Sequence, residues 1–213
     1  MAPVLIAVTL AATGCQGEKS KDGSSASPSS AKWSCDKILG HQAEEAVRRV
    51  ANIPDSATIR FSGHPEDAAR AFVANHDAGT ADEAGDLDFC RVYRESSEVL
   101  PSVQVRFSLV QEIPERSDDP IGAEYRMGKV ARATTKKGLL YFECSSSKFS
   151  LGAGATVLVR GESRTSDEVT EAEDAAQEDN LRIVYESSRA FSELLGCKTN
   201  AGLPDSFTMP PKV

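Results

Sequence analysis

The sequence has few of the residues that usually reveal a catalytic or metal site. It contains one Trp and three His in 213 residues, and no two His stand at the i, i+4 spacing of a metal-binding helix. The patterns GxSxG, HExxH, GxxxxGKS/T and GxGxxG are absent. The sequence therefore lacks the motifs that identify common serine hydrolases, zinc peptidases and nucleotide-binding proteins. We therefore assign no catalytic residue, no metal ligand and no cofactor.

Clusters of positive charge are also missing. The chain has 24 Lys and Arg against 32 Asp and Glu, a net charge of -8. Affinity for a phosphate backbone comes from clustered Lys and Arg, so we expect no nucleic-acid partner. The most acidic stretch, residues 166–180, lacks the DxDxDG turn of a calcium loop, and we interpret it as a solvated acidic helix face.

No apolar run reaches the about 20 residues that span a bilayer. The uncharged N-terminus, with its short apolar core, predicts a signal peptide over residues 1–14. The stretch LAATGC resembles a bacterial lipobox, in which small residues precede a Cys that becomes the diacylated N-terminus. We expect Cys15 to carry the lipid anchor; a plain secretory signal with a coincidental Cys, or a short buried strand, is the alternative.

The segment after Cys15 is rich in Ser and has no core-forming residue, so residues 15–32 should be a flexible tether. Residues 33–213 then form a single domain. A tether behind an acylated Cys15 predicts a lipid-anchored protein on the extracytoplasmic side of the cell membrane. The membrane is thus one expected partner, and an unknown envelope protein or glycan is another.

Four further cysteines, Cys35, Cys90, Cys144 and Cys197, form an even set in a chain expected to be exported. Four Cys allow three pairings. We favour Cys35 with Cys90 and Cys144 with Cys197, because the two spacings are nearly equal and each pair would join a helix end to a strand. No CxxC spacing favours a metal site, and oxidation in this compartment disfavours a catalytic thiol.

Hydrophobic periodicity predicts an α+β fold with two disulfides, in which an antiparallel sheet of about 4 to 6 strands packs against two or three helices. Helices are expected over residues 36–51 with a kink at Gly40, from Pro65 to before Gly79, and over residues 181–195 with Gly196 as a cap. Strands are expected at residues 59–61, 89–94, 103–109, 129–135, 139–144 and 157–159.

Three features of the chain order add to this interpretation. The order helix, strand, strand and then strand, strand, helix suggests two halves related by a pseudo-twofold repeat. Residues 202–213, with three prolines, should lie on the domain as an extended tail. Trp33 is interpreted as a core plug at the start of the domain, with stacking on a sugar as its alternative.

The Cys15 lipobox, the Ser-rich tether and the motifs around the other cysteines resemble uncharacterised actinobacterial cell-surface lipoproteins, including the DUF3558-like group. The motifs are WSC at Cys35, FCRVY at Cys90, YFECSSS at Cys144 and FSELLGC at Cys197. The resemblance spans most of the chain. It implies a cell-surface lipoprotein and supplies no catalytic residues.

Two functional hypotheses remain. The first is a non-catalytic binding module, whose acidic surface favours basic proteins, cations or neutral glycans. The second is a cell-wall hydrolase that uses carboxylates such as Glu143 or Glu162, which requires two carboxylates about 5 to 10 Å apart in a cleft.

Three other groups of residues are candidates for a chemical role. The pairs His64 with Asp67 and His76 with Asp77 are weaker acid/base candidates. Residues 152–155 are interpreted as a hairpin turn rather than a phosphate loop.

Overall fold

The computed structural model describes residues 33–80, 85–95, 100–115, 122–150 and 155–213. Its elements are α1 (Cys35–Val50), β1 (Ile59–Ser62), α2 (Pro65–Asp77), β2 (Leu87–Arg94), β3 (Val103–Val110), β4 (Ala123–Tyr125), β5 (Val130–Ala133), β6 (Lys137–Ser145), β7 (Thr156–Thr165), α3 (Glu173–Leu195) and the 3-10 helix η1 (Lys198–Gly202). The predicted signal peptide, Cys15, the tether and the turn glycines Gly152 and Gly154 lie outside the described residues.

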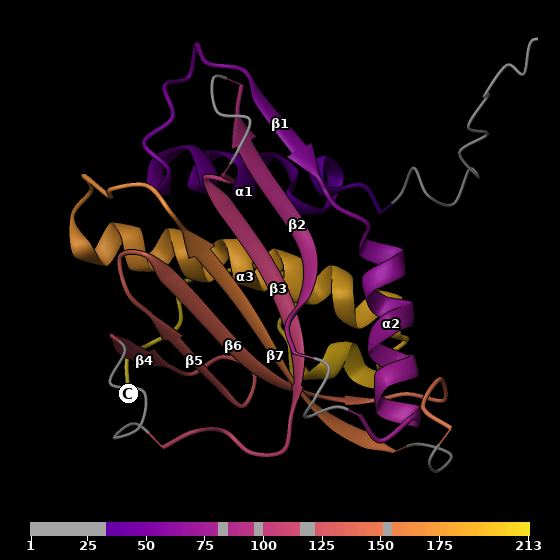
Figure 1. Ribbon diagram of the computed structural model, residues 1–213. Helices are drawn as coiled ribbons and strands as arrows, with labels where there is room; N and C mark the ends of the chain where they lie inside the picture. The colour runs from indigo at the N-terminus through magenta and orange to yellow at the C-terminus, as the bar shows by residue number, and fades with distance from the viewer. Residues whose placement is uncertain (1–32, 81–84, 96–99, 116–121, 151–154) are drawn as a thin grey trace, which may run out of the picture.

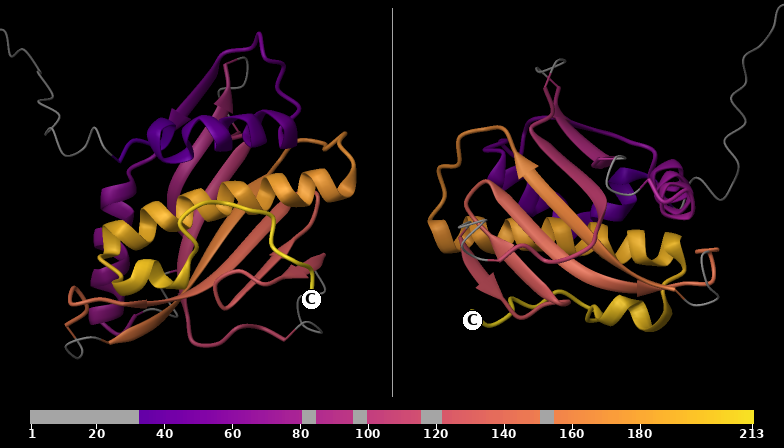
Figure 2. Two further views of the ribbon diagram at one scale, coloured as in Figure 1. Left: turned by 180° about the vertical axis from the view of Figure 1, so that it is seen from behind. Right: turned by 60° about the horizontal axis from the view of Figure 1, so that its bottom comes forward.

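The strands form one antiparallel sheet in the order β1-β2-β3-β7-β6-β5-β4. Helices α1 and α3 cover one face of this sheet, and no described helix covers the other, which we call the open face (Figures 1 and 2). The α+β class is confirmed. The sheet has seven strands rather than 4 to 6, because the three residues of β4 are too few for alternation to reveal.

Alternation along the central strands explains why the sheet has two different faces. In β3, Val103, Val105 and Phe107 are buried, whereas Gln104 and Arg106 between them are partly exposed. Consecutive strands pair with each other, since β2 pairs with β3 and β5 pairs with β6. The apolar set faces α3, so the polar set lines the open face.

Aromatic rings fill the space between the sheet and α3. Phe107 stacks on Phe191 with ring centroids 4.0 Å apart, and Phe89 meets both rings edge-on. Gly161 of β7 lets α3 approach this cluster, because a Cβ there would stand 2.8 Å from the Phe107 ring. Phe72 of α2 joins at 5.3 Å from Phe191, so α2 packs against the end of the same layer.

The helix ends follow the sequence signals. Gly40 interrupts α1 with φ 55°, and Gly196 ends α3 in the left-handed conformation, as predicted. Helix α3 begins at Glu173, eight residues before the expected start at Leu181. The solvated acidic face expected there is wrong in part, because Gln177, Asp179 and Asn180 are buried. Their partners come from elsewhere in the chain.

The C-terminal tail lies on the domain, as expected. Tyr185 donates a hydrogen bond of 2.7 Å to the Pro204 carbonyl. Further on, the Val213 N–H donates to the Glu124 carbonyl at 2.9 Å, and an isolated bridge joins Lys212 to Tyr125. The tail therefore covers the β4 edge of the sheet (Figure 1).

The proposed pseudo-twofold repeat stays a prediction. The first three strands and the last four meet where β3 pairs with β7 over eight residue pairs. Trp33 is half-buried and packs against the core, in line with a plug at the domain entrance. None of the helices in the described residues is both long enough and apolar enough to cross a membrane.

Candidate ligand site on the open face of the sheet

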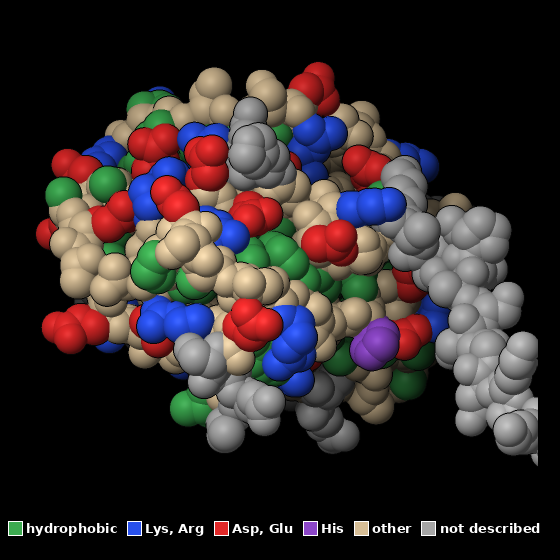
Figure 3. Space-filling view, turned by 90° about the horizontal axis from the view of Figure 1, so that it is seen from above, with side chains coloured by type: hydrophobic (Ala, Val, Ile, Leu, Met, Phe, Trp, Pro, Cys, Tyr) green, Lys and Arg blue, Asp and Glu red, His purple; other side chains and the backbone are tan. Residues whose placement is uncertain are grey.

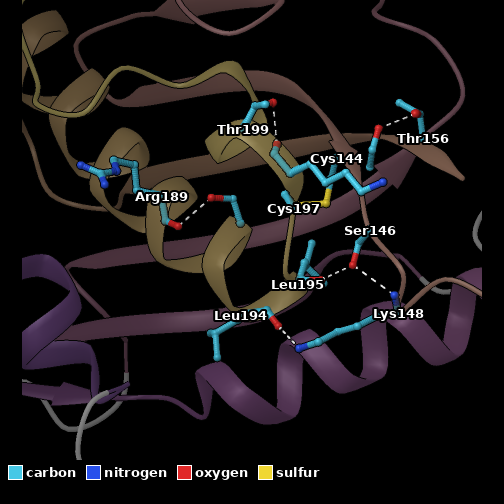
Figure 4. The surroundings of a disulfide bond; sticks show 12 residues. Cys144, Ser146, Lys148, Thr156, Arg189, Leu194, Leu195, Cys197 and Thr199 are labelled. Carbon is cyan, nitrogen blue, oxygen red and sulfur yellow. Dashed lines mark hydrogen bonds between the residues drawn. A yellow bond between two sulfur atoms is a disulfide. The ribbon is translucent and has the colours of Figure 1, made fainter. Parts of the chain in front are cut away.

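Both favoured disulfides are present. Cys35 at the start of α1 bonds to Cys90 in β2, and Cys144 in β6 bonds to Cys197 just after α3. The Cα separations are 5.6 and 5.0 Å, within the usual range. Figure 4 shows Cys144–Cys197 beside Ser146, whose hydroxyl donates to the Leu195 carbonyl at 2.6 Å. All four thiols are thus used to cross-link helix ends to the sheet.

The residues of the two histidine and aspartate pairs make structural contacts with neighbouring residues. His76 Nδ1 lies 3.0 Å from Asp77 Oδ1, and the His76 ring packs 4.9 Å from Phe149. The Ser150 hydroxyl and N–H also donate to Asp77, and these bonds, followed by that of His76, lower the pKa of its carboxyl. The pair therefore ties the end of α2 to the segment after β6. In the second pair, Asp67 binds Arg70.

Glu143 and Glu162 are not brought together. Glu143 pairs with Lys129 at 3.0 Å, and Glu162 binds Lys137 at 3.4 Å and Arg164 at 2.9 Å. Glu162 lies opposite Leu139 of β6, and Leu139 is four residues from Glu143 on the same strand. At the usual rise per strand residue, the two carboxylates are about 13 Å apart along the strands. That separation exceeds the range of a glycosidase carboxylate pair.

Charged residues of alternating sign form a row across the open face. In register, the row runs through Asp88, Arg106, Glu162, Leu139, Arg132 and Glu124. Opposite charges are in contact along it, with Arg106 3.4 Å from Asp88 and Arg132 3.1 Å from Glu124. Such cross-strand pairs each add about 0.2–1 kcal/mol and fix the register of neighbouring strands.

Ser108 of β3 and Arg160 of β7 lie beside this row, opposite each other in register. Their neighbours Phe107 and Gly161 face α3, so Ser108 and Arg160 face the open side. Ser108 is only 7% exposed, yet its Oγ has no hydrogen-bond partner among the described residues, and neither has the buried Nε of Arg160. Leaving a buried polar group unpaired costs about 1–3 kcal/mol.

A groove of about 470 Å³ opens at these two side chains, and we call it the β3-end groove. Its lining is Gly85, Asp86, Ser108, Leu109, Val110, Gln111, Glu112 and Arg160. Asp86 holds Arg160 in place, with Nη2 and Oδ1 2.5 Å apart, and lies 3.8 Å from Arg106 Nη1. The groove is therefore lined by the Ser108 side chain and by the Arg160 guanidinium, whose orientation the ion pair with Asp86 fixes.

The backbone of β3 adds polar groups to the groove. Strand β2 begins at Leu87, opposite Phe107, whereas β3 continues to Val110. Ser166 N–H donates to the Ser102 carbonyl at 3.1 Å. Because hydrogen-bonded and non-hydrogen-bonded pairs alternate along an antiparallel ladder, the even-numbered residues of β3 are the ones whose backbone groups bond to β7. The N–H and C=O of Leu109 therefore point away from β7, toward the side where the groove lies.

Charges in the β3-end groove nearly balance. In the lining, Arg160 opposes Asp86 and Glu112, and beside the lining Arg106 lies 3.8 Å from Asp86, so a strongly charged ligand gains little from the local field. Interspersed acidic and basic side chains are also seen on the face drawn in Figure 3. The arrangement suits a neutral ligand whose oxygen atoms accept hydrogen bonds from Ser108 and Arg160 and whose hydroxyls donate to the carboxylates.

Sequence reasoning assigned Ser108 to the polar side of its strand and did not identify it, or Arg160, as part of a site. Alternation indicates which face a side chain occupies, but an unpaired hydroxyl becomes visible only when its neighbours are placed. Within the described segments, no group of three or more His, Cys, Asp or Glu could hold a metal ion.

A second polar groove, of about 510 Å³, lies at the end of α1. Arg49 donates two hydrogen bonds to the buried carboxylate of Asp179, which raises the pKa of Arg49. Glu171 lines the groove 3.8 Å from Arg49. Burial first, and then the negative charge and hydrogen bond of Asp179, raise the pKa of the Glu171 carboxyl.

A third groove, which is largely apolar, runs along α2 and has a volume of about 810 Å³. It is lined by Glu66, Ala69, Arg70, Val73, Ala74, Asp77, Lys148 and Leu194. Lys148 lies across its edge and donates to the Leu194 carbonyl at 2.6 Å (Figure 4). Arg70, Asp77 and Lys148 in its lining are thus already paired, unlike the Ser108 hydroxyl of the β3-end groove among the described residues.

The comparisons with known proteins give no relative. No family model matches the chain, and neither the curated proteins nor the solved structures contain a match.

Proposed function

We propose that the protein is a lipid-anchored, non-catalytic binding module on the extracytoplasmic side of the cell membrane, and that its ligand occupies the β3-end groove. The Ser108 Oγ and the Arg160 Nε, both buried and without a partner among the described residues, support this proposal, because a ligand oxygen that reaches them would satisfy both. The near balance of charge favours a neutral, hydroxyl-rich ligand, and an envelope glycan has that chemistry.

The membrane location rests on the N-terminal sequence and gains support from the two disulfides. Disulfides persist in oxidising compartments outside the cytosol. The resemblance to actinobacterial cell-surface lipoproteins belongs to the same proposal. A Cys15→Ser variant should leave the membrane fraction of the native host, whereas the wild type should stay there. Retention of the variant in the membrane fraction would contradict the anchor.

Titration of the oxidised domain with chitotetraose, a neutral oligosaccharide, tests the groove, with inorganic phosphate as the anionic comparison. We expect the saccharide to shift the NMR signals of Ser108 and Arg160 and phosphate to leave them unchanged. Ser108→Ala should weaken binding about five- to tenfold, the equivalent of one hydrogen bond. Arg164→Lys, on the same strand and face as Arg160, is the control.

Three results would count against the site: no saccharide-induced shift near Ser108, equal affinity in Ser108→Ala, or a larger effect in the Arg164→Lys control. Stronger shifts with phosphate would reject the neutral ligand class.

The alternative, a cell-wall hydrolase, finds support at Glu171 rather than at Glu143 or Glu162. A general acid requires a carboxyl with a raised pKa, and burial together with the neighbouring Asp179 raises the pKa of Glu171. Release of soluble fragments from purified cell wall, abolished in Glu171→Gln and retained in Glu45→Gln, would establish this function. No release by the wild type would remove it.

A further inference from the structure

The two edges of the sheet differ in the part of the chain that the structure describes. At the β4 edge, the C-terminal tail supplies backbone partners, since Arg126 N–H donates to the Pro211 carbonyl and Val213 N–H to the Glu124 carbonyl. Strand β1 forms the opposite edge and pairs only with β2 among the described strands. Strand β4, with only three residues, thus pairs with an extended segment. Strand β1 has four residues and can pair with such a segment in the same way.

The pairing pattern fixes which backbone groups of β1 point outward. Glu95 N–H donates to the Thr58 carbonyl at 3.2 Å. Hydrogen-bonded and non-hydrogen-bonded pairs alternate along an antiparallel ladder, so Arg60 bonds to Tyr93 of β2. The N–H and C=O groups of Ile59 and Phe61 therefore point away from the sheet. These groups present the spacing that an added strand requires.

A groove of about 870 Å³ runs along this edge, lined by Asp36, Thr58, Ile59, Arg60, Phe61 and Glu95. Ile59 and Phe61 are half-buried and pack against the core, so their apolar side chains are only partly covered. Arg60 lies on the other face, with its guanidinium 4.4 Å from the centre of the Tyr93 ring. The edge thus offers apolar side chains on one face and a cation on the other.

Charge decides between a second copy of this chain and a different partner. If two β1 strands paired about a twofold axis in the longest register that their outward groups allow, Ile59 would face Phe61 and Arg60 would face its own copy. Like charges directly opposite each other destabilise a sheet. The tether does not supply the segment either, because residues 16–32 contain no Val, Leu, Ile or Phe to cover Ile59 and Phe61.

We infer that the β1 edge binds an extended segment of a different polypeptide, which adds an eighth strand to the sheet. The segment has apolar residues where it lies beside Ile59 and Phe61 and an acidic residue opposite Arg60. Basic residues flank this core, near Asp36 and Glu95. This partner site is separate from the β3-end groove and does not depend on the ligand proposed there.

A capped synthetic peptide, Thr-Lys-Val-Glu-Val-Lys-Thr, tests the inference by titration into the ¹⁵N-labelled, oxidised domain. We expect the largest amide shifts at Ile59 and Phe61, because their N–H groups donate to the added strand. The variant Arg60→Glu should bind this peptide about two- to fivefold more weakly. It should prefer Thr-Lys-Val-Lys-Val-Lys-Thr, in which the central residue is basic.

The matched control is Arg126→Glu at the β4 edge, which should bind both peptides as the wild type does. The same titration of the β3-end groove with chitotetraose should be unaffected by either variant. Shifts confined to other elements, or Arg60→Glu with an unchanged preference, would overturn the inference. So would a concentration-dependent dimer in sedimentation that is lost in Ile59→Pro but kept in Ile59→Val, since a second copy would then occupy the edge.

Discussion

Arg49 of α1 binds Asp179 of α3 through two parallel hydrogen bonds, with Nε and Nη2 2.8 and 2.7 Å from the two carboxylate oxygens. The residues are separated by 130 positions in the sequence. The pair joins the two helices that cover the sheet. It also explains why an acidic side chain is buried on α3, because a charge-assisted pair of bonds offsets much of the cost of removing Asp179 from water.

Asp179→Asn should lower the free energy of unfolding by about 1.5–3 kcal/mol, because the bidentate, charge-assisted contact with Arg49 is lost. Urea denaturation of the oxidised domain measures this loss. Glu45→Gln is the control, since Glu45 lies 3.9 Å from Arg49 in an exposed pair and should change stability by at most about 0.5 kcal/mol. Equal losses of stability in the two variants would show that the contact of Arg49 with Asp179 stabilises the domain no more than its contact with Glu45.

Stability should depend on pH through Glu171. Burial and Asp179 raise its pKa above the ordinary value of 4.5, so the folded carboxyl holds its proton more tightly than the unfolded one. This contribution is complete below pH 4.5 and is lost as pH rises through the raised pKa. Relative to the wild type, Glu171→Gln should therefore gain stability as the pH rises above 4.5 and through the raised pKa. Urea midpoints at several pH values test this, and parallel profiles for the two proteins would refute it.

Removing the Cys144–Cys197 disulfide by the double change to Ala should lower the free energy of unfolding by about 2–5 kcal/mol. The bond closes a loop with a sequence separation of 53, and Cys35–Cys90 closes one of 55. We therefore expect similar losses for the two bonds in thermal or urea denaturation. A loss much larger for one than for the other would indicate that packing around that bond, rather than loop closure, controls its effect.

Gly161→Ala should destabilise the domain by about 1–3 kcal/mol, because its Cβ would stand 2.8 Å from Phe107 Cε1 and 2.9 Å from Ser188 Oγ. Ser188→Ala alone should be neutral or slightly stabilising, since it removes a buried hydroxyl that has no partner among the described residues. The double variant should recover part of the loss. Purely additive effects in urea denaturation would show that Ser188 does not contribute to the crowding.

Local patterns were sufficient for most of the fold. Alternating residues predicted the strands β3 and β6, and Gly196 predicted the end of α3. The nearly equal spacing of the four Cys predicted both disulfides. These signals lie within a few residues of one another or follow from simple counting, so the sequence carries them directly.

Contacts between distant segments were not predictable in the same way. Strand β4 exists because β5 and the tail cover its three residues on both sides. Asp179 looks like part of a solvated acidic run until Arg49 is placed beside it. The β3-end groove depends on where β2 begins relative to β3 and on the absence of a partner for Ser108, and neither follows from residue periodicity.

The two disulfides also determine how the domain would respond to mechanical tension applied at its ends. In the sequence, Cys35 lies close to the predicted tether, and Cys197 lies close to the tail. A pulling force would pass through the sulfur bridges and bypass α1, β1 and α2 at one end and β7 and α3 at the other. Only the stretch between Cys90 and Cys144 and the tail beyond Cys197 could extend, so an oxidised domain held at a surface would lengthen far less than a reduced one.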